Sequence, residues 1–253
     1  MIYHYTSVNS LALILSNRSI LLNNLSRVDD ATEGITRDLG PLMQYVFVSS
    51  WTREDDENIA LWSMYTPNMA GVRIGLPASF LEWQYDDDGF VKNLKGNVRN
   101  THLVFAPRRP VPVAVNYVPD DDVPFTMMQA RTTEISTHWD NYLPELGTRK
   151  SQLWAFQRET RFILFAVPVN AVEQFSDSAF GNAVVALLKR PKTELKGIEV
   201  ALPDNVLNRM DITIGPNPGS QQSHERIVKA LIDKYIPSHE GQIRNSRVRV
   251  RNR

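Results

Sequence analysis

The stretch from Lys150 to Phe165 reads Lys-Ser-Gln-Leu-Trp-Ala-Phe-Gln-Arg-Glu-Thr-Arg-Phe-Ile-Leu-Phe. It ends in a run of large apolar residues, which is typical of a strand buried on both faces of a sheet. Because alternate side chains of a strand point the same way, we expect Gln157, Glu159 and Arg161 to share one face. An amide, a carboxylate and a guanidinium at the edge of a buried strand form a polar patch. Such a patch is either a salt-bridged support or a functional site.

Composition is that of an ordinary soluble globular protein. The 253 residues are enough for a large core in one or two domains, with 42% apolar and 22% charged residues. The 28 basic and 28 acidic residues balance, so no global charge favours a nucleic acid or a membrane surface. The absence of Cys excludes disulfides and thiolate metal sites, and it fits the cytoplasm.

The sequence predicts neither a signal peptide nor a membrane span. The N-terminal Met-Ile-Tyr-His-Tyr lacks the basic start and the apolar run of a signal peptide. No apolar stretch approaches the roughly 18 residues that a membrane-spanning helix needs. We therefore expect a cytoplasmic protein without a membrane partner.

Apolar periodicity predicts many short strands and a few helices. Apolar and β-branched runs favour strands at 2–6, 18–22, 45–51, 71–76, 111–118, 162–165, 182–189, 196–201 and 211–214. Helical spacing favours helices at 8–15, 59–65, 125–146 and 221–236, with a short helix from 203–204. No repeat or long linker divides the chain. We predict one α+β domain over residues 1–236 and a basic C-terminal tail over 237–253, which carries Arg244, Arg247, Arg249, Arg251 and Arg253.

Familiar metal and phosphate motifs are missing from the sequence. No two His have the i,i+4 spacing of a zinc helix. The two triple-Asp runs at 86–88 and 120–122 lack calcium-loop spacing, so they favour solvated turns. There is no phosphate-cradling glycine loop and no nucleophile elbow. We expect no metal site.

Polar and aromatic residues are instead spread along several predicted elements. A strand His, a strand Ser pair, a helix aromatic residue and a late Glu together are what an ADP-ribosyltransferase that cleaves NAD needs. Its reaction breaks the bond from ribose to nicotinamide through an oxocarbenium-like state, which a nearby carboxylate stabilises. No metal is required. The candidate residues are His4, Thr6, Ser49, Ser50, Trp62, Tyr65, Gln157 and Glu159.

On this hypothesis NAD is the substrate, and the first half of the chain supplies most of its binding site. His4 and Thr6 bind a ribose, with His4 donating to a hydroxyl. Ser49 belongs to the same NAD-binding set. The ring of Tyr65 or Trp62 lines the nicotinamide pocket, where an aromatic face can stack on the base.

The later stretch supplies the chemistry. Glu159 is the expected catalytic carboxylate. Gln157, two residues earlier, orients the acceptor group, and Arg161 places Glu159 or a phosphate. The Arg-rich tail either grips a nucleic acid backbone, with affinity that falls as salt rises, or is a solvated terminal strand.

Each candidate residue also has a purely structural explanation. A strand His is more often a satisfied core residue than a ligand, and helical aromatic residues more often belong to a core. Paired serines can serve as hydrogen-bond partners at a strand end. A Glu and an Arg two apart can form a strand salt bridge. These explanations define the alternative, a non-catalytic module of the same fold that binds nucleic acid or protein.

A series of short motifs runs along most of the chain, at Tyr3 to Thr6, Asp29 to Glu33, Ser49 to Trp51, Leu61 to Tyr65, Gly71 to Gly75, Trp154 to Arg161 and 212–216. In their order, these segments resemble a large bacterial family, the domain of unknown function 2971. The sequence departs from the family pattern at Gln157, where the family has Glu, at Thr160, where it has an aromatic residue, and in the early loop.

The family's start is similar to that of ADP-ribosyltransferase toxins and defence proteins. By this fold-level analogy, the resemblance implies a split, mostly antiparallel ADP-ribosyltransferase-like sheet flanked by helices. It also implies transfer of ADP-ribose from NAD to a nucleic acid or a protein, in bacterial toxin–antitoxin systems or phage defence. An antitoxin or another protein is then an expected partner.

Overall fold

A computed structural model describes residues 1–106, 111–132 and 137–251, with the backbone alone for residues 129–132 and 137–141. In these residues ten strands form one main sheet, in the order β14-β2-β5-β1-β6-β15-β16, with β13 pairing with β5, β7 and β8. All of its pairs are antiparallel except β15 with β16. The ten strands are β1 (Ile2–Thr6), β2 (Ser19–Asn24), β5 (Val46–Thr52), β6 (Val72–Leu76), β7 (His102–Phe105), β8 (Val113–Ala114), β13 (Glu159–Pro168), β14 (Gly197–Ala201), β15 (Asp211–Ile214) and β16 (Ile243–Asn245).

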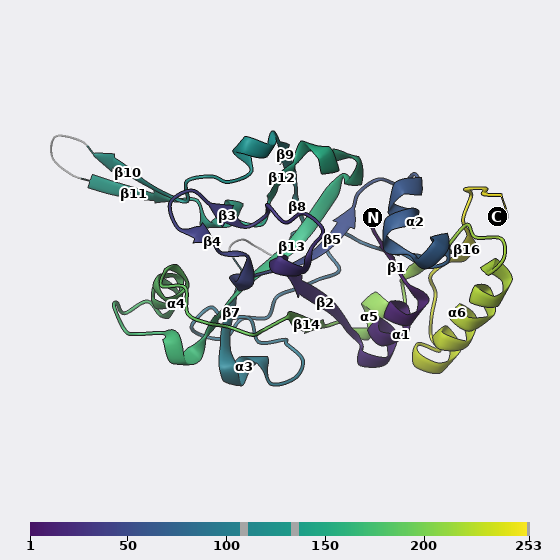
Figure 1. The fold of residues 1–253 in the computed structure, drawn as a ribbon. Helices are drawn as coiled ribbons and strands as arrows, with labels where there is room; N and C mark the ends of the chain where they lie inside the picture. The colour runs from purple at the N-terminus through teal and green to yellow at the C-terminus, as the bar shows by residue number, and fades with distance from the viewer. Residues whose placement is uncertain (107–110, 133–136, 252–253) are drawn as a thin grey trace.

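Helices and small two-stranded sheets surround the main sheet (Figure 1). The α-helices are α1 (Val8–Asn17), α2 (Ile59–Tyr65), α3 (Val98–Thr101), α4 (Ala179–Leu188), α5 (Asp204–Leu207) and α6 (Gln221–Tyr235). The small sheets pair β3 (Ile35–Thr36) with β4 (Gly40–Pro41), β9 (Asn116–Val118) with β12 (Arg149–Ser151), and β10 (Met128–Thr132) with β11 (Thr137–Asn141). Short 3₁₀ helices are η1 (Leu25–Arg27), η2 (Met43–Tyr45), η3 (Pro67–Met69), η4 (Asp120–Asp122), η5 (Leu143–Glu145), η6 (Gln152–Gln157) and η7 (Val169–Ala171).

Strand β13 is buried along its whole length, as its apolar run predicts. Phe162 and Leu164 belong to one hydrophobic core, and Ile163 and Phe165 belong to the core on the opposite side. Helices α1 and α6 contribute to the first core and α4 to the second. We name the two sides the α1–α6 face and the α4 face. The predicted mixed fold, with a mostly antiparallel sheet and flanking helices, is confirmed.

Strands β1 and β2 diverge along one edge of β5. The opposite edge of β5 pairs with β13 as far as Thr52. On the diverging edge, β2 pairs with Phe47 and Val48, whereas β1 pairs with Thr52. In the described part of the chain, residues 49–51 pair with neither strand. The divergence therefore leaves a gap in the sheet beside the middle of β5.

Two sequence-based predictions of secondary structure are wrong. The predicted strand at 182–189 is the helix α4, whose Ser178 accepts a hydrogen bond from the Gly181 N–H as an N-cap. A short apolar run fits a buried strand and a buried helix equally well, and Ala and Leu favour the helix. The predicted helix at 125–146 instead contains the β10–β11 hairpin, which projects from the body in Figure 1, and residues 133–136 lie outside the described residues. Thr and Trp in this segment favour strands.

The chain beyond residue 236 contacts the domain. Strand β16 adds to the sheet beside β15, and the Arg247 N–H donates to Glu57 at 2.8 Å. Arg249 and Arg251 are exposed, while Arg253 lies outside the described residues. The boundary at residue 236 stays a prediction. Within the described ranges, no helix has the length and apolarity needed to cross a membrane.

Candidate functional site

The gap between β1 and β2 opens into a cavity of about 350 Å³. Elements far apart in the sequence meet there, namely β1, α1, β2, β5, α2 and the start of β13. Most of the site residues predicted from the sequence line it: His4, Thr6, Ser49, Tyr65, Gln157, Glu159 and Arg161. Trp62 does not line the cavity. Its buried indole packs edge-on against Tyr5 and donates to Glu57 at 3.0 Å.

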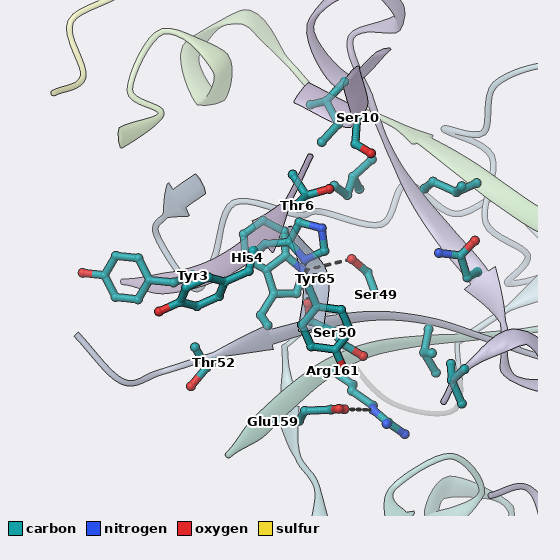
Figure 2. Close-up of a pocket in the computed structure, with 18 of the residues that line it drawn as sticks. Tyr3, His4, Thr6, Ser10, Ser49, Ser50, Thr52, Tyr65, Glu159 and Arg161 are labelled. Atoms are coloured by element: carbon teal, nitrogen blue, oxygen red, sulfur yellow. Dashed lines mark hydrogen bonds and ion pairs between the residues drawn. The ribbon is translucent and has the colours of Figure 1, made fainter. Parts of the chain in front are cut away.

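The lining residues fall into two groups on opposite sides of the sheet (Figure 2). His4, Thr6 and Ser49 lie at every second position from core residues such as Ile2 and Phe47, so they share the α1–α6 face. Glu159 and Arg161 lie four and two positions before Ile163, so they share the α4 face with it. Both groups reach one cavity because, within the described residues, neither β1 nor β2 pairs with residues 49–51 on the edge of β5 opposite β13.

His4 is held as a neutral imidazole. Its Nδ1 lies 2.8 Å from the Ser50 carbonyl oxygen, and since a carbonyl oxygen only accepts, Nδ1 carries the proton. Burial lowers the pKa of His4, although the hydrogen bond to Ser50 opposes this shift. Nε2 then has a free lone pair. His4 is therefore set to accept a hydrogen bond from a ligand, whereas the sequence led us to expect a donor.

Four buried charged side chains lie together on the α4 face, and we name them the charge quartet: Glu33, Lys150, Glu159 and Arg161. Glu159 Oε1 lies 2.9 Å from Lys150 Nζ, and Glu159 Oε2 lies 2.6 Å from Arg161 Nε. Glu33 pairs with Arg161 through both carboxylate oxygens and lies 3.3 Å from Lys150 Nζ. Two positive and two negative charges sum to zero. This balance lets the quartet be buried without a net charge.

Glu159 is the carboxylate of the quartet that lines the cavity, together with Lys150 and Arg161. Its side chain is 8% exposed, while Glu33 is 0% exposed. Burial alone would raise the pKa of Glu159, but the charges of Arg161 and Lys150 outweigh it, so its pKa is lowered. Glu159 is consequently ionised at neutral pH. A carboxylate has about four lone-pair sites, so two ion pairs leave room for hydrogen bonds from a ligand.

Gln157 connects the quartet to Tyr65. Its Oε1 accepts from Lys150 Nζ at 2.7 Å, and its Nε2 donates to the Tyr65 hydroxyl at 2.7 Å. Tyr65 in turn donates to Asp29 at 2.8 Å. Burial, followed by the nearby Asp29 carboxylate, raises the pKa of Tyr65. The amide of Gln157 is thus held in one orientation, with its oxygen toward Lys150.

The expectation that Gln157 shares a strand face with Glu159 is wrong. Gln157 ends the 3₁₀ helix η6, and Arg158 follows with φ of 45° before β13 begins at Glu159. This left-handed backbone is uncommon for a residue with a side chain. The turn still brings both Gln157 and Glu159 to Lys150 Nζ.

Ser49 lies on the far side of the sheet from Glu159. Its buried hydroxyl accepts from the Trp51 indole N–H at 2.9 Å. The Trp51 ring lies 5.2 Å from the His4 ring, centroid to centroid. Ser49 therefore holds Trp51 beside His4.

Several residues of the site, among them Glu33, Lys150 and Tyr117, were not among the sequence-predicted candidates. Glu33 stood in a polar loop, and only the resemblance of the segment Asp29 to Glu33 drew attention to it. Lys150 stood at the head of the quoted stretch without a pattern of its own. The Tyr117 hydroxyl accepts from the Glu159 N–H at 2.8 Å, and burial raises the pKa of Tyr117 to about 12. No sequence spacing indicates these contacts, because they arise from the tertiary fold.

In the described part of the chain, no group of three or more His, Asp or Glu side chains is arranged to hold a metal ion. Comparisons with protein-family models, with curated proteins and with solved structures returned no match. The likeness to the family described under Sequence analysis therefore stays a prediction.

Proposed function

We propose that the chain is an ADP-ribosyltransferase that uses NAD as its substrate. The observation that carries the proposal is the meeting of His4 and the ionised Glu159 in one cavity, together with the Tyr65 ring. These groups come from β1, the start of β13 and α2. A neutral His and an aromatic ring can bind the ribose and the nicotinamide of NAD, and a carboxylate can stabilise the positive charge that develops as the bond between them breaks.

The reaction assigns a role to each group. The bond between ribose C1′ and the nicotinamide nitrogen breaks, and its electron pair leaves on nicotinamide. Glu159 stabilises the positive charge that develops on the ribose and accepts from a ribose hydroxyl. The nucleophilic atom of the acceptor then bonds to C1′, and its proton passes to solvent.

The remaining cavity residues fit positioning roles. His4 accepts from a ribose hydroxyl through Nε2, and the ring of Tyr65 offers a face for nicotinamide. Arg161 and Lys150 hold the two oxygens of Glu159 in place. Gln157, which the sequence suggested as the acceptor guide, is engaged by Lys150 and Tyr65, so we assign it to the support of the site.

The size of the cavity fits part of the substrate. Ligand pockets generally measure about 300–1,000 Å³, and the cavity of about 350 Å³ stands at the small end of that range. It suits nicotinamide and its ribose, with the rest of NAD extending outward. The acceptor is a nucleic acid or a protein, in keeping with a role in toxin–antitoxin systems or phage defence.

The alternative is a non-catalytic module that binds nucleic acid or protein. The closed charge quartet favours it, because both oxygens of Glu159 already pair with buried cations. On this alternative, Glu159 supports the fold and no NAD is cleaved.

Incubation with NAD labelled in its adenylate part separates the two functions. The transferase releases nicotinamide and labels a DNA, an RNA or a lysate protein. A binding module does neither, and the same outcome with all three acceptors would contradict the proposal. Expression in a bacterial host gives a second measurement, in which toxicity that Glu159→Ala removes supports the enzyme.

A further inference from the structure

The cavity continues into a second hollow over β2 and β14. This hollow has a volume of about 510 Å³. Leu21, Asn23 and Glu199 are among the residues that line both spaces. Glu199 lies opposite Leu21 in the sheet, and Gly197 lies opposite Asn23. The side chains of Leu21, Asn23 and Glu199 therefore lie on one face of the sheet. The two spaces adjoin along these shared residues, and we call them together the groove.

Gly197 keeps the floor of the hollow open. A Cβ atom at this position would lie 2.8 Å from Leu21 Cδ1. Any larger residue would displace Leu21 and fill part of the space. The absence of a side chain at residue 197 therefore leaves this space to Leu21 and to the hollow.

Three cations line this hollow, namely Arg27, Lys95 and Lys196, and we name it the basic hollow. Within the described residues, their side chains form no hydrogen bond or ion pair with the protein. Arg18, by contrast, forms an ion pair with Asp204. Three unpaired positive charges around one concavity create a positive potential that attracts an anion.

Glu199 is an acidic residue that lines both spaces. Glu199 Oε2 accepts from Ser19 Oγ at 2.6 Å and from Asn17 Nδ2 at 3.4 Å. In the described residues, its Oε1 has no hydrogen-bond partner. A carboxylate there suits a sugar hydroxyl rather than a phosphate, so it divides a hydroxyl-binding stretch from an anion-binding stretch.

We infer that the basic hollow binds the diphosphate of a ligand whose other end occupies the first cavity. The inference rests on the proposed function, because it assigns a place to the diphosphate of NAD. Arg27 supplies a planar fork for phosphate oxygens, and Lys95 and Lys196 supply point charges. A small dinucleotide fits better than a nucleic acid, because the three cations gather around one hollow. The chain as a whole carries no net charge that would attract a long polyanion.

Calorimetric titration with two probes tests the inference without any need for catalysis. ADP-ribose carries the diphosphate, and nicotinamide riboside lacks it. The test variant is Lys95→Gln combined with Lys196→Gln. Arg209→Gln is the control, since it removes an exposed cation that does not line the groove.

The double variant should bind ADP-ribose about tenfold more weakly than wild type at low salt. The difference should shrink at high salt because the charges are exposed. Binding of nicotinamide riboside should be unchanged, and Arg209→Gln should match wild type with both probes.

Three results would overturn the inference. One is equal ADP-ribose affinity in wild type and the double variant. Another is a wild type that binds ADP-ribose no better than nicotinamide riboside. The third is a short single-stranded oligonucleotide that outcompetes ADP-ribose and depends on the same lysines. Nicotinamide release is measured separately, so a protein that binds ADP-ribose as expected but never cleaves NAD contradicts the proposed function alone.

Discussion

Arg161 and Glu33, 128 positions apart in the chain, face each other as a two-pronged ion pair in the protein interior. Arg161 Nη2 lies 3.1 Å from Glu33 Oε1, and the second prong joins Nη1 to Oε2. The Arg161 side chain is 1% exposed and the Glu33 side chain 0%. This pair fixes the guanidinium that holds Glu159. The loop before β3 thus determines the geometry at the start of β13.

Replacing Glu33 tests this relationship. Glu33→Gln leaves Arg161 and Lys150 buried with only one carboxylate, so the quartet carries a net positive charge. We expect the free energy of unfolding to fall by about 3–5 kcal/mol, as measured by urea unfolding followed through Trp fluorescence. Glu173→Gln, at an exposed pair with Lys189, is the matched control and should change stability by less than about 0.5 kcal/mol. Equal effects of the two substitutions would contradict the account.

The lowered pKa of Glu159 predicts how stability depends on pH. The folded protein releases this proton more readily than the unfolded chain does. The contribution of the ionised Glu159 to folding stability is therefore complete above the ordinary Glu pKa of about 4.3. This contribution is lost as the pH falls through the lower pKa of the folded state. Urea unfolding between pH 7 and pH 3 should show less loss of stability in Glu159→Gln than in wild type. Parallel curves would mean that Glu159 is not held ionised.

His4 should remain mostly neutral at the pH at which an exposed His is half protonated. Burial lowers its pKa below the ordinary value of about 6.5, so the neutral form stabilises the fold above that pH and this stabilisation is lost on acidification. An NMR titration of ¹⁵N-labelled protein should report a lowered pKa and a proton on Nδ1. A proton on Nε2 would contradict the hydrogen bond to Ser50.

Substitutions of Tyr65 and of Trp62 should have different effects on ligand affinity. Tyr65→Phe removes a hydroxyl that joins Gln157 to Asp29 beside the cavity, so affinity for nicotinamide riboside should fall about fivefold, the equivalent of one hydrogen bond. Trp62→Phe removes a side chain that does not line the cavity, and affinity should stay at the wild-type value. Calorimetric titration measures both. A larger loss in Trp62→Phe would place the ligand elsewhere.

The sequence carried enough information for most of the main sheet. The runs around Phe162 and around residues 45–51 have one plausible structure each, because β-branched and aromatic residues in a buried run favour strands. The segment at 182–189 has two plausible structures, since its apolar residues suit a buried helix as well as a buried strand. There the N-cap at Ser178 and the packing against β13 decide the structure.

The site was only partly predictable for a different reason. Residues such as His4 and Glu159 stand out because a titratable side chain is unusual in a strand that is otherwise mostly apolar or aromatic. Lys150 and Glu33 are ordinary charged residues in the sequence, and they acquire their importance only when folding brings them to Arg161 and Glu159. Trp62 shows the opposite case, since helical spacing with Tyr65 could not tell which ring faces the cavity.

The most direct test of the central claim is nicotinamide release from NAD by wild type and by Glu159→Gln. The comparison needs folded protein, so near-ultraviolet circular dichroism is recorded for both, and Glu173→Gln serves as the control with an exposed carboxylate removed. We predict release by wild type and by Glu173→Gln, and a rate at least about 100-fold lower in folded Glu159→Gln. Release at the wild-type rate by folded Glu159→Gln, or no release by wild type with any acceptor, would contradict the account.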